Sequence, residues 1–136
     1  MAVGEPAFLD SNVLLYAVGD DDARRAVAES LIAGHPVVSA QVLAETAAVL
    51  RRKFQLERPA IEKILLAVVP RVRCEPVTSQ TVLAALRWGE ALGYSHYDSQ
   101  IIAAALEAGC TILYSEDMQH GQLIDGRLTI VNPFVT

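Results

Sequence analysis

Cysteine is scarce in this sequence, and positive charge is in deficit. Cys74 and Cys110 form no CxxC pair and have no paired histidine spacing nearby, so a zinc site of the usual kind is excluded. We interpret both as small core residues of a protein in the reducing cytoplasm, the location we expect. The 11 lysines and arginines against 16 acids leave a net charge of −5, which argues against nucleic-acid binding through bulk positive charge. A nuclease is not excluded, because acids gathered in one site would bind cations locally.

Long apolar runs are also missing. No run reaches the 18 residues that a membrane-spanning helix needs, and the opening segment MAVGEPAFLD lacks the basic region and the apolar stretch of a signal peptide. No internal repeat, low-complexity tract or linker divides the 136 residues, of which 52% are hydrophobic and 20% charged. We therefore expect one soluble globular domain over residues 1–136, with no membrane association.

Short apolar runs alternate with segments of helical periodicity. The runs lack in-out alternation, which is typical of strands covered on both faces; they are residues 7–9, 36–39, 111–114 and 128–131, with an edge strand at 72–77 that contains Pro76. The expected helices, bounded by Ser, Pro and Gly signals, are residues 22–33, 40–54, 59–68, 80–92 and 96–108. This alternation predicts a three-layer α/β/α sandwich with a mainly parallel central sheet.

Two of the expected strands end in acidic residues. Asp10 follows the first strand directly, and Glu116 and Asp117 follow the strand TILY and Ser115. Ligands of parallel sheets bind outside the carboxyl ends of the strands. We therefore expect these acids to lie at the ligand-binding edge of the sheet.

Two of the expected helices bring further acids to that edge. Asp98 lies near the centre of the buried stripe of helix 96–108, so its carboxylate points inward. Glu45 lies on the border of the apolar stripe of helix 40–54, which consists of Val42, Leu43, Val49, Leu50 and Phe54. Four separate segments therefore deliver acids to one place.

Each acid also has an ordinary structural interpretation, as a helix cap, an ion-pair partner or a turn residue. The candidates are Asp10 capping a helix that starts near Asn12, Asp98 with Ser95 in a capping-box-like pattern, Glu45 with Arg52, and Glu116 and Asp117 in a turn. Four unrelated structural roles that place acids at one edge of the sheet are a weaker explanation than one functional site. Two carboxylates about 5 Å apart repel by roughly 3 kcal/mol at an effective dielectric near 20, so the group must share protons, meet a buried cation or coordinate a metal. All-oxygen ligands favour Mg²⁺ or Mn²⁺, and such a centre suits phosphoryl transfer.

A resemblance to a known family rests on four features of the sequence. They are FLDSNVLLYA near the N-terminus, Glu45, the long segment YSHYDSQIIAAALEAGCTILYSEDMQHGQ, and the final IVNPF. Together they resemble a PIN domain, and more narrowly the VapC-like toxins of bacterial toxin–antitoxin pairs. The resemblance covers nearly the whole chain.

The resemblance implies a Mg²⁺- or Mn²⁺-dependent endoribonuclease that acts as the toxin of a toxin–antitoxin pair. The catalytic acids it implies are Asp10, Glu45, Asp98 and Asp117, with Asp10, Asp98 and Asp117 as metal ligands and with Asn12 and Ser115 as supporting polar residues. Glu116 falls at a more variable position of the family. The implied partners are an RNA substrate, a VapB-like antitoxin whose C-terminal tail occupies the groove, and a second copy of the chain in a homodimer.

The same residues argue against two other enzyme classes and one binding module. A receiver-type phosphoacceptor domain needs a lysine at a late strand end, whereas Lys53 and Lys63 both lie on expected helices. A phosphatase of the Asp-x-Asp type needs a second Asp where Asn12 stands. The alternative of a different class is a catalytically silent PIN-like binding module, and the four intact acids argue against it.

Some further residues have two interpretations. His96 and His120 flank acids as possible proton donors or metal ligands, but we interpret them as exposed polar residues. We interpret Trp88 as core or interface packing rather than as a base-stacking platform. The basic triplet 51–53 either contacts RNA phosphates or lies on an ordinary solvated helix face.

Overall fold

Short strands of the chain form one six-stranded sheet in the order β3-β2-β1-β4-β6-β5. The structure is a computed structural model that describes residues 6–135, so the first residues of MAVGEPAFLD, on which the expected lack of a signal peptide rests, lie outside it. The strands are β1 (Ala7–Leu9), β2 (Val37–Ser39), β3 (Arg73–Glu75), β4 (Ile112–Tyr114), β5 (Leu123–Ile124) and β6 (Leu128–Val131).

All neighbouring strands pair in parallel except β5, which runs antiparallel to β6. The central strand β1 pairs with β2 through Phe8 and Val37, and with β4 through Leu9 and Tyr114. From β1 the chain adds β2 and β3 on one side and then returns to add β4 on the other. The carboxyl ends of β1 and β4 therefore flank a topological switch point, where parallel sheets bind ligands.

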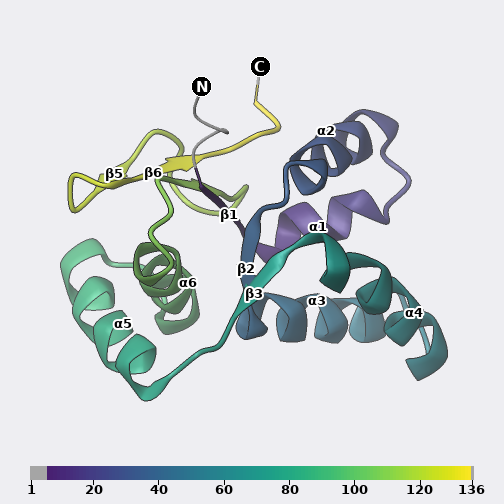
Figure 1. The fold of residues 1–136 in the computed structure, drawn as a ribbon, viewed down its shortest axis with the longest axis horizontal. Coiled ribbons are helices and arrows are strands. Elements are labelled where there is room, and N and C mark those ends of the chain that lie inside the picture. The colour runs from purple at the N-terminus through teal and green to yellow at the C-terminus, as the bar shows by residue number, and fades with distance from the viewer. Residues whose placement is uncertain (1–5, 136) are drawn as a thin grey trace.

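Helices cover both faces of the sheet. Figure 1 shows α5 and α6 on one side of the central strands and α1 to α4 on the other, so the expected three-layer α/β/α sandwich with a mainly parallel sheet is confirmed. The helices are α1 (Ser11–Ala17), α2 (Asp22–Ala33), α3 (Ala40–Arg52), α4 (Arg58–Val68), α5 (Ser79–Leu92) and α6 (His96–Glu107), with a 3₁₀ turn at Val69–Arg71. No helix within residues 6–135 is long and apolar enough to cross a membrane.

Local capping explains where the site-bearing helices begin. The Ser39 hydroxyl accepts the Val42 N–H at the start of α3, and the Ser95 hydroxyl accepts the Asp98 N–H at the start of α6. Each hydroxyl satisfies one of the free N–H groups of a helix start. Helix α3 starts where β2 ends, and the end of α6 leads into the start of β4, so both helices begin at the carboxyl edge of the sheet.

The expected elements are present with ends shifted by at most two residues. The expected set did not include β5 or the 3₁₀ turn, and α1 entered only as the helix that Asp10 would cap. Helix α1 spans two turns, which is too short for a clear period, and β5 has two residues. Two expectations about burial were wrong. Cys74 is exposed because it lies on the edge strand β3, and Phe54 is 48% exposed because α3 ends at Arg52, before its apolar stripe reaches that ring.

Candidate functional site

Asp10 occupies the switch point, between the end of β1 and the start of α1. Only 4% of it is exposed, and its carboxylate accepts the Ser11 N–H at 2.7 Å and the Ser115 hydroxyl at 2.8 Å. Its own N–H donates to the Tyr114 carbonyl at the end of β4. Asp10 therefore caps α1, as its structural interpretation holds, and also presents a buried carboxylate at the sheet edge.

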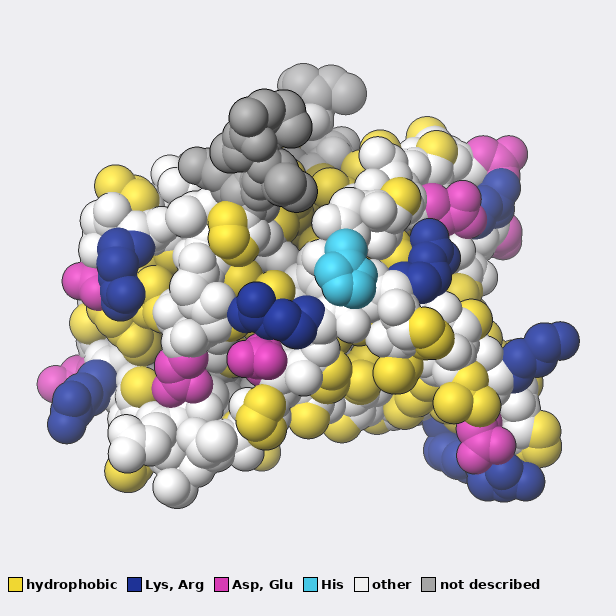
Figure 2. Space-filling view, viewed as in Figure 1, with side chains coloured by type: hydrophobic (Ala, Val, Ile, Leu, Met, Phe, Trp, Pro, Cys, Tyr) yellow, Lys and Arg dark blue, Asp and Glu magenta, His cyan; other side chains and the backbone are white. Residues whose placement is uncertain are grey.

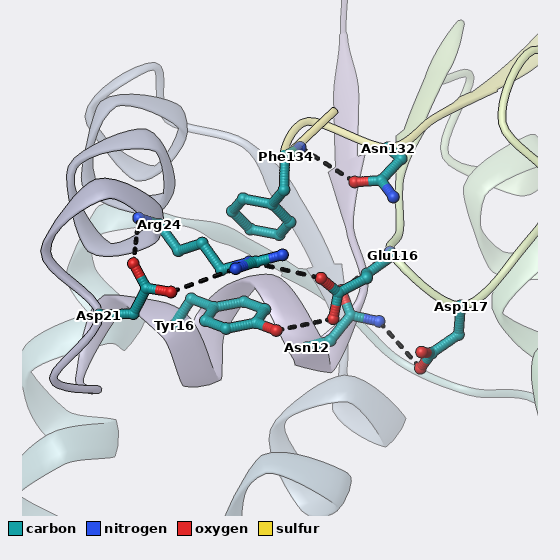
Figure 3. A network of polar contacts seen from close by, with 8 residues as sticks. All are labelled: Asn12, Tyr16, Asp21, Arg24, Glu116, Asp117, Asn132 and Phe134. Atoms are coloured by element: carbon teal, nitrogen blue, oxygen red, sulfur yellow. Dashed lines mark hydrogen bonds and ion pairs between the residues drawn. The ribbon is translucent and has the colours of Figure 1, made fainter. Parts of the chain in front are cut away.

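Asn12 and Ser115 connect Asp10 to the loop after β4. The Asn12 amide donates to Asp117 at 3.1 Å and, in a long contact of 3.5 Å, to Asp10, while its oxygen accepts the Glu116 N–H. The Ser115 hydroxyl donates to Asp10 and accepts the Asp117 N–H at 3.2 Å. Asp10 and Asp117 are therefore linked through shared polar neighbours, and Figure 3 shows the Asn12–Asp117 contact.

The acids act on one another electrostatically. Burial raises the pKa of Asp10 from 3.8 to about 6; the hydrogen bonds from Ser115 and Ser11 partly offset this, and the charges of Glu45 and Asp98 add to it. Burial and the charge of Asp117 raise the pKa of Asp98 as well. The four acids predicted from the sequence thus lie near enough to one another to share one electrostatic environment.

Glu45 and the helix that carries Asp98 are held by contacts that sequence reasoning missed. The Gln41 amide donates to Glu45 at 3.1 Å and to the Tyr97 carbonyl at 3.0 Å, and its oxygen accepts the Gln100 amide at 2.7 Å. Gln41 lies on α3 and Gln100 on α6, so this pair fixes the two acid-bearing helices against each other. The alternative interpretation of Glu45, an ion pair with Arg52, is not supported, because no such pair occurs within residues 6–135.

Glu116 turns away from Asp117. Its carboxylate accepts the Tyr16 hydroxyl at 2.8 Å and lies 3.6 Å from Nε of Arg24, whose guanidinium is 5.3 Å from the centre of the Tyr16 ring and 5.7 Å from that of Phe134 (Figure 3). The hydrogen bond to Glu116 is the main reason why the pKa of Tyr16 is raised. Glu116 therefore anchors the Asp117 loop to α1 and α2.

The two histidines that flank acids, His96 and His120, each contact another polar group. His96 is half-buried, with Nε2 3.1 Å from the Gln100 oxygen, so the expectation that it is exposed was wrong. His120 is exposed, as expected, and its Nδ1 accepts the Asn132 N–H at 2.9 Å. Trp88 is half-buried and packs against the hydrophobic core, in line with its packing interpretation.

The donor set fits a hard divalent cation. Within residues 6–135 no ion pair involves any of the four acids, and no three acidic, His or Cys side chains converge closely enough to form a ready-made set of ligands. Mg²⁺ commonly keeps several waters and takes only one or two carboxylates from the protein. A buried carboxylate without a cationic side chain beside it, among other oxygen donors, matches that preference.

Fold and site together define the class of this chain. It is a three-layer α/β/α domain with carboxylates gathered at the switch point of a parallel sheet. Residues 7–123 match the sequence profile of the PIN domain. The chain therefore belongs to the PIN domain family, as its resemblance implied.

Several solved structures are similar to this chain in fold. A Mycobacterium tuberculosis structure described as VapC20, a sarcin-ricin loop cleaving toxin, is 25% identical with a TM-score of 0.66, covering 82% of this chain and 89% of that one. A toxin–antitoxin complex from Klebsiella pneumoniae is 14% identical with a TM-score of 0.72, covering 94% and 98%. VapBC2 from Rickettsia felis, bound to a promoter DNA fragment, is 16% identical with a TM-score of 0.68, covering 91% and 96%. No curated protein matches the sequence significantly.

Proposed function

We propose that this chain is a Mg²⁺- or Mn²⁺-dependent endoribonuclease and the toxin of a toxin–antitoxin pair. The observation that carries the proposal is the buried carboxylate of Asp10, whose pKa of about 6 reflects burial beside other acids without an ion-paired Lys or Arg from residues 6–135. Such a group is ready to bind a cation. Membership of the PIN domain family supports the same conclusion.

Each residue of the site has a definite part in the proposal. Asp10, Asp98 and Asp117 would hold the cation, in part through its bound waters, with Glu45 completing the group of catalytic acids. Ser115 and Asn12 keep Asp10 and Asp117 in fixed positions by donating to their oxygens. With a divalent cation held there, the site would supply an activated water and positive charge for the phosphate oxygens in phosphodiester cleavage. Without it, the acids would repel the RNA backbone.

The proposed partners follow from the similar structures. Two of them are toxin–antitoxin complexes, and a third is described as a toxin that cleaves the sarcin-ricin loop. We extend this to an RNA substrate for the present chain and to a VapB-like antitoxin that blocks the acid site. We also propose that the chain forms a homodimer and is located in the cytoplasm.

Cleavage of RNA by the purified protein tests the proposal. Labelled total RNA is incubated with the protein in Mn²⁺ or Mg²⁺, and in parallel with EDTA or with Asp98→Asn. Cleavage that needs both the metal and Asp98 is the expected result. Intact RNA in every reaction, from a protein that melts cooperatively, would instead favour the silent binding module.

A further inference from the structure

A cleft of about 470 Å³ opens directly beside the acid site. Asn12, Glu116 and Asp117 line it on the side of the acids, and Arg52, Lys53 and Phe54 line it from the end of α3. Its volume lies within the range of about 300–1,000 Å³ typical of ligand sites. We call it the Phe54 cleft. A molecule bound in it would extend from the end of α3 to Asp117.

The structure divides the basic triplet of the sequence between two surfaces. Arg52 and Lys53 line the Phe54 cleft, whereas Arg51 lines a separate depression with Arg58 and Leu66. Elsewhere, Lys and Arg side chains are scattered among acidic ones over the face in Figure 2 rather than gathered in one broad basic surface. The triplet is therefore more than a uniformly solvated helix face.

The charges around the Phe54 cleft favour an anionic ligand near α3. Arg52 and Lys53 are exposed and form no ion pair with any of residues 6–135. Among the acids that line the cleft, Asp21 and Glu116 lie against Arg24. Asp117 belongs to the proposed cation site and accepts a hydrogen bond from the neutral Asn12 amide, and Asp20 is exposed. The available positive charge thus lies opposite the catalytic acids.

Phe54 adds an aromatic surface to these cations. Its ring is 48% exposed and follows the end of α3, where its N–H bonds the Val49 carbonyl. Exposed aromatic rings on which bases stack, next to cations that contact phosphates, are how proteins bind single-stranded nucleic acids. The two features occur together here beside the proposed cleavage site.

We propose that the Phe54 cleft binds one nucleotide of single-stranded RNA next to the scissile phosphate. Phe54 stacks on the base, and Arg52 and Lys53 contact the flanking phosphates. This places a substrate subsite on one side of the acids and explains how an acidic protein holds RNA. The inference rests on the proposed function.

RNA binding tests the subsite separately from cleavage. Fluorescence anisotropy measures the affinity for a fluorescein-labelled, random-sequence 12-nucleotide RNA. Cleavage is prevented by EDTA, or in Mg²⁺ by adding Asp98→Asn to every protein compared. Phe54→Ala should weaken binding roughly 5- to 150-fold, the range for loss of one base–aromatic stack, and Phe54→Trp should retain it. Arg52→Gln and Lys53→Gln should each make the slope of log K against log salt shallower by about 0.7, whereas Phe54→Ala should leave the slope unchanged. Arg51→Gln is the matched control, because Arg51 has the same charge on the same helix end but lies outside the cleft.

The outcomes separate this inference from the proposed function. RNA affinity that is the same in Phe54→Ala, Lys53→Gln and the Arg51→Gln control overturns the subsite, even if the wild-type protein cleaves RNA. A wild-type protein that binds RNA through Phe54 but never cleaves it overturns the nuclease and keeps the subsite. Unchanged RNA binding with weakened binding of an antitoxin tail would assign the cleft to a protein partner and overturn the inference.

Discussion

Replacing Asp10 by Asn should stabilise the metal-free protein at neutral pH, and the gain should disappear in acid. The pKa of Asp10 is raised from 3.8 to about 6, so the folded protein holds this proton more tightly than the unfolded chain does. Between those pH values the folded state binds more protons, and wild-type stability falls as pH rises. Asn keeps the shape of the side chain and carries no charge to bury.

The shift of roughly 2 pKa units corresponds to about 3 kcal/mol. For a chain of 136 residues this is about 10 °C in melting temperature. The free energy of unfolding, measured by urea denaturation in EDTA from pH 4.5 to 8, should show the advantage of Asp10→Asn growing by roughly 2 kcal/mol over that range. Asp20→Asn, at an exposed carboxylate, is the control and should show little change with pH.

The reasoning is wrong if the difference between Asp10→Asn and wild type does not depend on pH. It is also wrong if Asp10→Asn is strongly destabilised at pH 8, because Asp10 would then act mainly as the cap of α1. Either result would remove the electrostatic argument for a cation beside Asp10.

Other perturbations test the remaining parts of the site. Ser115→Ala removes a hydrogen bond that lowers the pKa of Asp10. In urea titrations the decline of the variant's stability with rising pH should therefore extend to higher pH than in the wild type. Mn²⁺ at about 100 times its Kd should raise the unfolding free energy by roughly 2.7 kcal/mol, whereas Na⁺ at matched ionic strength should not; an unchanged melting curve in millimolar Mn²⁺ counts against the metal site. Tyr16→Phe should cost about 1 kcal/mol of stability, and Glu116→Gln should lower kcat more than it raises KM because the Asp117 loop loses its anchor. An antitoxin tail peptide should inhibit less in excess Mn²⁺ and less again when its arginines are replaced by Ala, since guanidinium groups bind carboxylates bidentately; equal inhibition by a peptide without Arg or Lys would refute this.

The placement of the acids was predictable from sequence because it depends on local signals. Apolar runs locate the strand ends, and Asp10 and Asp117 follow two of those ends. The supports of the site were harder to predict. Gln41 contacts Gln100, and Arg24 contacts Glu116, only after the chain has folded. These residues are far apart in the sequence, so helix and strand periodicity does not predict their contacts.

Two errors have similarly physical causes. Helical periodicity placed Phe54 on the buried stripe of α3, but the helix ends two residues earlier and leaves the ring half exposed. Cysteine usually prefers burial, yet Cys74 lies on the edge strand β3, which has no further strand beyond it. Both errors arose where an element ends or a sheet stops, which residue preferences do not encode.

The central claim is that four carboxylates act as one metal-dependent RNA-cleaving unit. The most direct test compares Mn²⁺-dependent cleavage of one RNA by wild type, by Asp10→Asn, Glu45→Gln, Asp98→Asn and Asp117→Asn, and by the exposed controls Glu29→Gln and Glu90→Gln. Each of the four should lose roughly a hundredfold or more in rate, the double variant Asp10→Asn/Asp98→Asn should be little worse than either single change, and both controls should keep wild-type rates. Full activity in any of the four, or the same loss in a control, would contradict the account.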